Sequence, residues 1–150
     1  MHVIILGCGR VGSTLARHMY RDGHDVTVID LQSEAFRRLG SKFKGQRVIG
    51  NGPDRDVLER AGIKNCDVFV SVTQGDNRNI MTAQIAREVY QVQRVLTRIN
   101  DPIRADAYRD RGIVTICGTT IISGLMRDFL LTDRWAIERD YNKEYIASGM

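Results

Sequence analysis

A glycine-rich stretch near the start of the chain has the residue types and spacing of a phosphate-binding loop. The stretch Gly7-Cys8-Gly9-Arg10-Val11-Gly12 fits the pattern G-x-G-x-x-G, between an apolar run and a helical pattern. Gly7 permits a tight turn, Gly9 lets backbone N–H groups approach phosphate oxygens, and Gly12 lets a helix pack closely on a strand. Arg10 adds a guanidinium that can hold phosphate through two hydrogen bonds, unless it points to solvent.

An acidic residue follows this loop at the position that reads a ribose. Asp30, with Leu31 beside it, ends the apolar run 26–29, eighteen residues after Gly12. A carboxylate there accepts hydrogen bonds from both ribose hydroxyls and repels a 2′-phosphate. We therefore expect an adenine nucleotide as ligand, either NAD/NADH or ATP/ADP/AMP, in preference to NADP. The alternative is a glycine turn that serves packing alone.

Further polar residues follow the later apolar runs. Asn51 and Gly52 come after the third run and are expected beside the adenine, whereas Thr73 and Gln74 come after the fourth, near the ribose or base. Arg98 ends the fifth run. The carboxyl ends of parallel strands meet at one edge of a sheet, so these side chains are expected at the same crevice. Each stretch is also compatible with an ordinary turn.

Short apolar runs alternate with helical patterns along most of the chain. Six strands separated by five helices predict an α/β fold, a Rossmann-like doubly wound parallel sheet with strand order 3-2-1-4-5-6. The expected strands are 3–6, 26–29, 48–49, 68–72, 95–97 and 113–116. The first expected helix carries Val11, Leu15 and Met19 on one face, and the second carries Phe36 and Leu39. The third begins with Pro53 at the first helical position and has Asp54 and Asp56 in its first turn. Met81, Ile85 and Val89 mark the fourth, and Asp101-Pro102 caps the fifth.

The last helical pattern, over 119–131, is apolar over an unusually wide face. Its large side chains spread over roughly 180° of the helix, whereas packing on one sheet requires about 100°. The pattern indicates that this helix also covers a partner subunit, with burial under the chain's own tail as the alternative. We expect a nucleotide-binding domain over 1–132 and a short tail, or the start of a second subdomain, over 133–150. The apolar side chains are Ile121, Ile122, Leu125, Met126, Phe129 and Leu130.

Composition disfavours several other classes. The 22 basic residues exceed the 18 acidic ones by only four and are dispersed, which disfavours nucleic-acid binding. Cys8, Cys66 and Cys117 form no C-x-x-C pair and have no histidine at ligand spacing, so reduced thiols in a cytosolic protein without a metal are expected. No signal peptide and no apolar run of membrane-spanning length is visible.

Catalytic residues are hard to find in this chain. His18 and His24 fall on or after the first helix, away from the strand ends, and Cys8 has no neighbouring histidine. A dehydrogenase needs acid–base groups beside the nicotinamide. We expect no enzyme activity, with an NAD-dependent oxidoreductase, or a fragment of one, as the alternative. A redox-sensing repressor would need a helix-turn-helix, which the pattern lacks.

Longer motifs resemble the N-terminal half of an RCK (KTN) domain of the TrkA-N type, the regulatory module of Trk/Ktr potassium uptake systems. The resemblance covers residues 1 to about 132. It rests on VIILGCGRVGSTLA, VIDLQSE, VIGNGPDRDVLERAGIKNCDVFVSVTQGDNRNIM and RINDP. The turn followed by D-x-x-V-L-x-x-A-G-I, and the strand ending in T-x-x-D-x-x-N, are its most particular features.

The resemblance implies a cytosolic, non-catalytic regulatory subunit at the inner face of the cell membrane. Such subunits form homodimers that can assemble into an octameric ring and gate a membrane potassium transporter or channel subunit when nucleotide binds. It places Arg10 at the phosphates and Asp30 at the ribose, and the helix after strand six across the subunit interface. Asn51, Gly52, Thr73, Gln74 and Arg98 would line the base and phosphates.

Two departures from the family pattern stand out. Many relatives have G-D-A or G-D-G after strand three, where this chain has Gly50-Asn51-Gly52. Many relatives also carry a C-terminal subdomain that senses a second ligand, whereas about eighteen residues follow the last predicted helix here. The first departure predicts different contacts beside the adenine.

Overall fold

The structure of the protein is a computed structural model that describes residues 1–111 and 113–132. The chain divides into two units, Met1–Cys117 and a second that begins at Gly118. The expected domain boundary after residue 132 coincides with the end of the described residues and stays a prediction.

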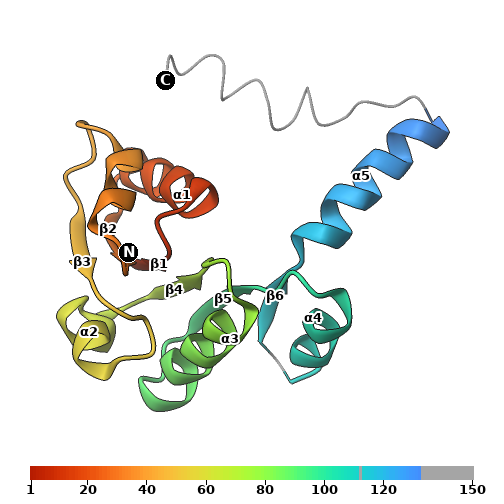
Figure 1. Ribbon diagram of the computed structural model, residues 1–150. Helices are drawn as coiled ribbons and strands as arrows, with labels where there is room; N and C mark the ends of the chain where they lie inside the picture. The colour runs from red at the N-terminus through yellow and green to blue at the C-terminus, as the bar shows by residue number, and fades with distance from the viewer. Residues whose placement is uncertain (112, 133–150) are drawn as a thin grey trace. The chain divides into compact units, whose positions relative to one another are not determined.

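The first unit is built around one parallel sheet of six strands (Figure 1). The strand order β3-β2-β1-β4-β5-β6 confirms the predicted doubly wound Rossmann-like topology. All five neighbouring pairs are parallel, so all carboxyl ends lie at one edge. The strands are β1 (His2–Leu6), β2 (Asp25–Asp30), β3 (Gln46–Ile49), β4 (Val68–Ser71), β5 (Arg94–Arg98) and β6 (Val114–Ile116).

Helical segments cover both faces of this sheet. Successive side chains of a strand point to opposite faces, and in β1 both sets are buried. Val3 and Ile5 pack with residues of α1 and η1, whereas Ile4 and Leu6 pack with residues of α2 and α3. Burial on both sides explains the unbroken apolar runs. The segments are α1 (Arg10–Arg21), the 3₁₀ helix η1 (Ser33–Leu39), α2 (Arg55–Arg60), the 3₁₀ turn η2 (Ile63–Asn65), α3 (Asp76–Gln84), the π turn η3 (Ile85–Val89) and α4 (Pro102–Arg109).

Two helix starts test the expected caps. Asp101 caps α4 as predicted, since its carboxylate accepts a hydrogen bond from the Arg104 N–H at 3.1 Å. The predicted start of α2 is confirmed with Asp56 in the first turn, but Pro53 precedes the helix and Asp54 is the capping residue. The Asp54 carboxylate accepts from the Asp56 N–H at 2.9 Å.

Two predicted buried faces also need correction. Met81 and Val89 are 54% and 48% exposed, and α3 with η3 instead buries a face that includes Ile80, Ala83 and Ala86. Val11 was expected on the buried face of α1 with Leu15 and Met19, yet it is 52% exposed at the first turn. Leu15, Met19 and Ile85 pack against the core as predicted, so only Val11, Met81 and Val89 were placed on the wrong face. The segment with Phe36 and Leu39 is a 3₁₀ helix rather than an α-helix.

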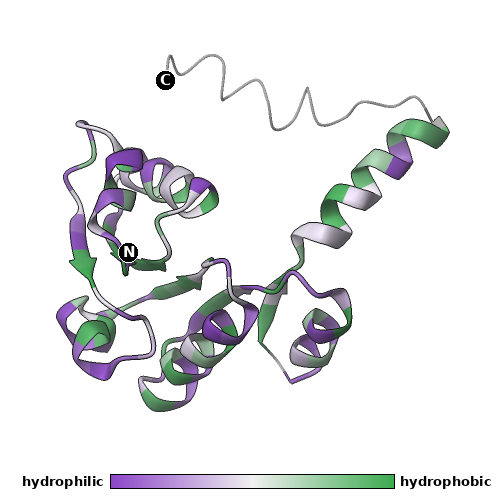
Figure 2. Ribbon diagram, viewed as in Figure 1, coloured by the Kyte–Doolittle hydropathy of each residue, from purple (hydrophilic) through white to green (hydrophobic). Residues whose placement is uncertain are grey.

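The second unit begins with helix α5 (Gly118–Thr132), which matches the predicted helix. Figure 2 shows hydrophobic residues recurring along this helix between pale and hydrophilic positions. In the described chain the large apolar side chains of α5 are all exposed, namely Ile121, Ile122, Leu125, Met126, Phe129, Leu130 and Leu131. Their coverage by a partner subunit stays a prediction. None of the described helices has the length and hydropathy needed to cross a membrane.

The turn from β1 into α1 depends on close approach at two glycines. Gly7 has a φ of +104° and donates its N–H to the Ile29 carbonyl at 2.8 Å. A Cβ on Gly7 would lie 3.0 Å from the Thr73 backbone nitrogen, and a Cβ on Gly12 would overlap the Gly7 carbonyl oxygen. Only glycines therefore allow the first turn of α1 to lie against the end of β1.

We predict that Gly12→Ala lowers the free energy of unfolding by about 3 kcal/mol, because the added methyl group meets backbone that cannot rotate away. Gly9→Ala is the matched control: a Cβ there meets nothing within 4 Å, and the φ of −73° suits alanine. Urea denaturation of both variants measures the difference. Equal stability of the two variants would contradict the close packing of α1 on β1.

Candidate functional site

A cavity of about 580 Å³ opens at the carboxyl ends of the strands. It lies where the strand order reverses between β1 and β4, the usual ligand position in open α/β sheets. Of the predicted site residues, only Gly12 does not line it, since Gly12 packs against the Gly7 carbonyl. The lining includes Gly7, Cys8, Gly9, Arg10, Val11, Asp30, Leu31, Asn51, Gly52, Thr73, Gln74 and Arg98.

Sequence reasoning missed other residues that line the cavity. Arg38 lies in η1, the 3₁₀ helix that follows Asp30, and Arg78 lies in the first turn of α3. Arg78 stands between the acidic and amide positions of the D-x-x-N motif, which was the available signal. Gln32 and Ala35 also line the cavity, beside Asp30.

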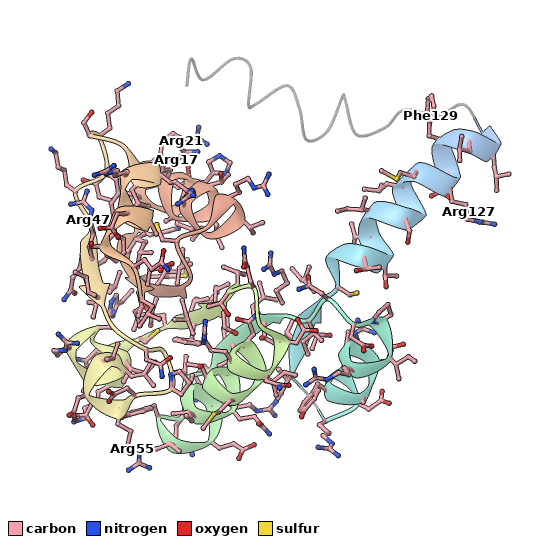
Figure 3. The ribbon with its side chains drawn as sticks, viewed as in Figure 1. Arg17, Arg21, Arg47, Arg55, Arg127 and Phe129 are labelled. Atoms are coloured by element: carbon pink, nitrogen blue, oxygen red, sulfur yellow. The ribbon has the colours of Figure 1, made fainter. Side chains whose placement is uncertain are left out.

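Charge in the cavity favours an anionic ligand. Among the residues that the structure describes, the lining includes Arg10, Arg38, Arg78 and Arg98 and a single acidic residue, Asp30. A concave surface with this excess of positive charge attracts polyanions. Other arginines, such as Arg17 and Arg21 on α1, Arg47 on β3 and Arg55 on α2, come from separate elements outside the lining (Figure 3).

The Asp30 carboxylate is fixed by two backbone hydrogen bonds. Its Oδ2 accepts from the Cys8 N–H at 2.6 Å, and its Oδ1 accepts from the Gln32 N–H at 3.0 Å. A carboxylate has about four acceptor positions, so two remain for a ligand. Asp30 therefore presents acceptors in a fixed orientation at the end of β2, as recognition of two ribose hydroxyls requires.

The Cys8 thiol lies behind the glycine loop and is fully buried. Its Sγ donates a hydrogen bond to the Ala35 carbonyl at 3.3 Å. Burial, with a smaller contribution from the negative charge of Asp30, raises the pKa of the Cys8 thiol to about 11. The thiol is neutral near pH 7, which agrees with a packing role rather than a nucleophilic one.

A second group of hydrogen bonds organises the ends of β4 and β5. The Arg98 Nη2 donates to the Thr73 carbonyl at 2.7 Å, whereas its Nε is buried without a hydrogen-bond partner among the described residues. The buried Asn79 side chain joins the backbone of Thr73 to the Arg98 carbonyl. The side chains of Asn79 and Arg98 therefore fix the position of Thr73 at the cavity.

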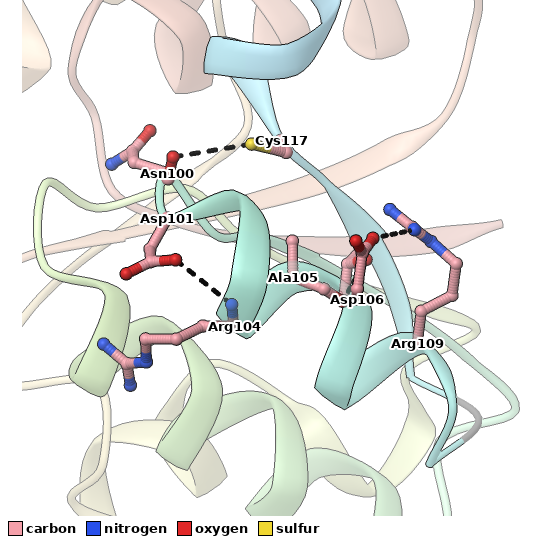
Figure 4. A network of polar contacts seen from close by, with 8 residues as sticks. Asn100, Asp101, Arg104, Ala105, Asp106, Arg109 and Cys117 are labelled. Carbon is pink, nitrogen blue, oxygen red and sulfur yellow. Dashed lines mark hydrogen bonds and ion pairs between the residues drawn. The ribbon is translucent and has the colours of Figure 1, made fainter.

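The loop after β5 is tied to the start of α3. The Asp76 carboxylate accepts from the backbone N–H groups of Asn100 and Asp101 at 3.0–3.1 Å. Figure 4 shows the next contacts, in which the Cys117 thiol donates to the Asn100 carbonyl at 3.4 Å and Asp101 caps α4. The carboxyl edge of β4, β5 and β6 is therefore one connected hydrogen-bonded layer.

Groups suited to acid–base or metal chemistry are scarce around the cavity. Among the described residues its lining includes no histidine, so the structure places neither His18 nor His24 there. In the same part of the chain, no three histidine, cysteine, aspartate or glutamate residues gather in a way that could hold a metal ion.

Known proteins similar to this chain include potassium uptake components. The Trk system potassium uptake protein TrkA of Streptomyces coelicolor is 51% identical over 116 residues, which are 77% of this chain and 52% of that protein. The chain thus spans about half the length of this relative.

Solved structures similar in fold include two described with bound nucleotides. The Kef C-terminal domain of Shewanella denitrificans in its AMP-bound form has a TM-score of 0.74 at 18% identity, covering 99% of this chain and 92% of that one. The GsuK channel bound to NAD has a TM-score of 0.73 at 21% identity, covering 86% of this chain and 23% of that one.

The model of the TrkA-N domain family matches residues 3–119, which include the whole lining of the cavity and all six strands except His2, the first residue of β1. Together with the TrkA relative, this match shows that the chain belongs to the TrkA-N domain family.

Proposed function

We propose that the chain is a cytosolic regulatory domain that binds an adenine nucleotide and thereby controls a potassium transport system. One observation carries the proposal: the cavity combines the glycine loop, a carboxylate in fixed orientation and four guanidinium groups in a TrkA-N domain. The similarity to a Trk system potassium uptake protein supports potassium as the transported ion. The AMP and NAD complexes of proteins with this fold support the ligand class.

The adenosine half of the ligand would lie on the β2 side of the glycine loop. Asp30 would accept from its ribose hydroxyls, with Leu31 beside the sugar. Asn51 and Gly52, at the end of β3, would flank the adenine. A 2′-phosphate would meet the Asp30 carboxylate, which disfavours NADP.

The phosphates would lie at the N-terminus of α1. Backbone N–H groups of the first turn lack partners within the helix, and the helix dipole favours negative charge there. Arg10 stands at the first position of α1, whereas Arg98 ends β5, and both line the cavity with Gln74. These groups supply donors to a pyrophosphate from two directions.

Regulation would follow from differential binding. A ligand shifts a conformational equilibrium only by the difference between its affinities for the two states, so nucleotides that contact the site differently would favour different geometries. A homodimer through α5, and an octameric ring at the inner face of the membrane, would carry that change to a membrane potassium transporter or channel subunit.

The alternative function is that of an NAD-dependent oxidoreductase, or of a fragment of one. It requires an acid–base group beside the nicotinamide. The described lining residues offer Asp30, which is bonded to two backbone amides at the ribose end, and the buried neutral thiol of Cys8. The proposed regulatory role therefore includes no catalysis.

The first test is calorimetric titration of the purified chain with ATP, ADP, AMP, NAD, NADH and NADPH. We expect binding of at least one nucleotide with an unphosphorylated ribose, and Asp30→Ala should weaken it by roughly 10- to 100-fold through loss of hydrogen bonds to a charged acceptor. Asp25→Ala is the matched control, an exposed carboxylate at the other end of β2, and should bind as the wild type does. Absence of binding by every nucleotide would refute the proposal.

Gly9→Ala separates ligand contact from folding. Its Cβ would enter open space at the N-terminus of α1, where the phosphates are expected, so we predict unchanged thermal stability and at least tenfold weaker nucleotide binding. Differential scanning fluorimetry and calorimetry of the same sample measure the two quantities. Wild-type affinity in this variant would place the phosphates elsewhere.

Transport is the third test. In cells whose own gene for this protein carries Asp30→Ala, potassium uptake should lose its dependence on the cellular nucleotide level, whereas the Asp25→Ala gene should preserve it. Rubidium influx before and after ATP depletion measures the difference. A nucleotide response that is the same in both strains would argue against a regulatory role for this site.

A further inference from the structure

Asn79 is a fully buried side chain whose four hydrogen bonds all serve the ends of β4 and β5. Its Oδ1 accepts from the Thr73 N–H at 2.8 Å and from the Thr73 hydroxyl at 2.7 Å. Its Nδ2 donates to the Thr73 and Arg98 carbonyls, both at 2.9 Å. Asn79 itself does not line the cavity, whereas Thr73 and Arg98 do.

The orientation of this amide is fixed by its partners. A backbone N–H can only donate and a carbonyl oxygen can only accept, so the atom facing the Thr73 N–H must be Oδ1 and the atom facing the two carbonyls must be Nδ2. The reversed amide would set two donors against one another and oxygen against two carbonyls. The amide is therefore held in one orientation.

This orientation fixes the polarity of the Thr73 hydroxyl. Asn79 Oδ1 carries no hydrogen, so the short contact between the two oxygens requires the hydroxyl of Thr73 to donate its only proton to Asn79. Thr73 Oγ1 then offers only lone pairs to the cavity. It can accept from a ligand hydroxyl, but it repels the acceptor oxygens of a phosphate.

We propose that Asn79 is a positioning residue that makes Thr73 an acceptor for a sugar hydroxyl in the second half of a dinucleotide, and that leaves phosphate recognition on this side to Arg98. The inference rests on the proposed nucleotide-binding function and identifies the ligand class as a dinucleotide or an ADP-linked sugar.

The position of Thr73 supports this assignment. Dinucleotides lie across the crevice at the reversal of strand order, with one half on each side of the glycine loop. Asp30 follows β2 on one side and Thr73 follows β4 on the other, and β1 lies between these strands. The first ribose would meet the acceptors of Asp30, and the second would meet the acceptor of Thr73.

Arg98 supplies the complementary donor beside this acceptor. The Arg98 Nη2 donates to the Thr73 carbonyl, so the Arg98 guanidinium is held beside Thr73, the residue that carries the acceptor hydroxyl. Arg98 lines the cavity, and its guanidinium N–H groups that the Thr73 carbonyl does not hold can donate to a pyrophosphate oxygen. The acceptor of Thr73 and the donors of Arg98 therefore lie next to each other, as a ribose hydroxyl and a phosphate do in a dinucleotide.

ADP and ADP-ribose form a matched ligand pair, since ADP-ribose adds a second ribose to ADP. We expect Thr73→Val, which removes the hydroxyl and preserves the shape, to weaken ADP-ribose about fivefold and to change ADP less than twofold. Thr73→Ser retains the hydroxyl and should restore wild-type affinity for ADP-ribose. Calorimetry with both ligands measures these ratios.

Asn79→Ala tests the positioning role itself. Without Oδ1 the Thr73 hydroxyl rotates freely, so Thr73→Val should have little further effect on ADP-ribose in that background. Additive losses in the double variant would overturn the role of Asn79, because a residue that only stabilises the fold would not change what Thr73 contributes. If Asn79→Ala does not fold, the comparison of the two Thr73 variants still decides whether the Thr73 hydroxyl contacts the second ribose.

The outcomes separate this inference from the proposed function. Selective weakening of ADP-ribose in Thr73→Val supports it. Equal weakening of both ligands, or of neither, overturns it, as does wild-type protein that binds ADP with Asp30-dependent affinity but does not bind ADP-ribose. Wild-type protein that binds neither ligand would remove the proposed function as well.

Discussion

The contact between the first turn of α1 and the carbonyl of Gly7 is the constraint on which the site depends. Because Gly12 lacks a Cβ, the helix can begin directly at the end of β1. This places the Cys8 N–H within 2.6 Å of the Asp30 carboxylate. The same approach leaves the Gly9 position open toward the cavity. One steric condition therefore determines both the open space beside Gly9 and the orientation of the Asp30 carboxylate.

Different hydrogen bonds hold the cavity-lining side chains on the two sides of the crevice. On the β2 side, backbone amides hold a charged acceptor, Asp30, which is itself half-buried and faces the ligand. On the β4 side, a neutral buried amide, Asn79, holds the groups that face the ligand. A buried amide with all four hydrogen bonds made avoids the cost of an unpaired polar group, and its fixed orientation sets the polarity of its neighbours. The site is thus ordered before any ligand arrives, which lowers the entropic cost of binding.

Sequence patterns predicted the sheet well because the burial of each strand residue is reflected in its own side-chain type. The runs that became β1, β2 and β4 are apolar on both faces, and the glycine loop and Asp30 follow them at fixed distances. Helix faces were less predictable: α3 and η3 bury Ile80, Ala83 and Ala86, while Met81 and Val89 are exposed. Arg38 reaches the cavity through the position of η1, which no local pattern records, whereas Arg78 lies inside the D-x-x-N motif and was overlooked. The role of Asn79 required the identity of its partners, since T-x-x-D-x-x-N shows the amide but not its four contacts.

A connected layer of polar contacts makes the β4 side of the crevice the suitable side for control. Asp76 and Asn79 belong to the same turn of α3, so Thr73 and Arg98 at the cavity share a support with Asn100 and Asp101. Asn100 in turn accepts from Cys117, the last residue before α5. If Asp30 holds the adenosine ribose as proposed, nucleotides that share an adenosine half would make the same contacts with Asp30 and would differ on the β4 side. On the proposed function, discrimination between ligands and transmission toward α5 would therefore depend on the same few hydrogen bonds, since only unequal contacts can favour one geometry over another.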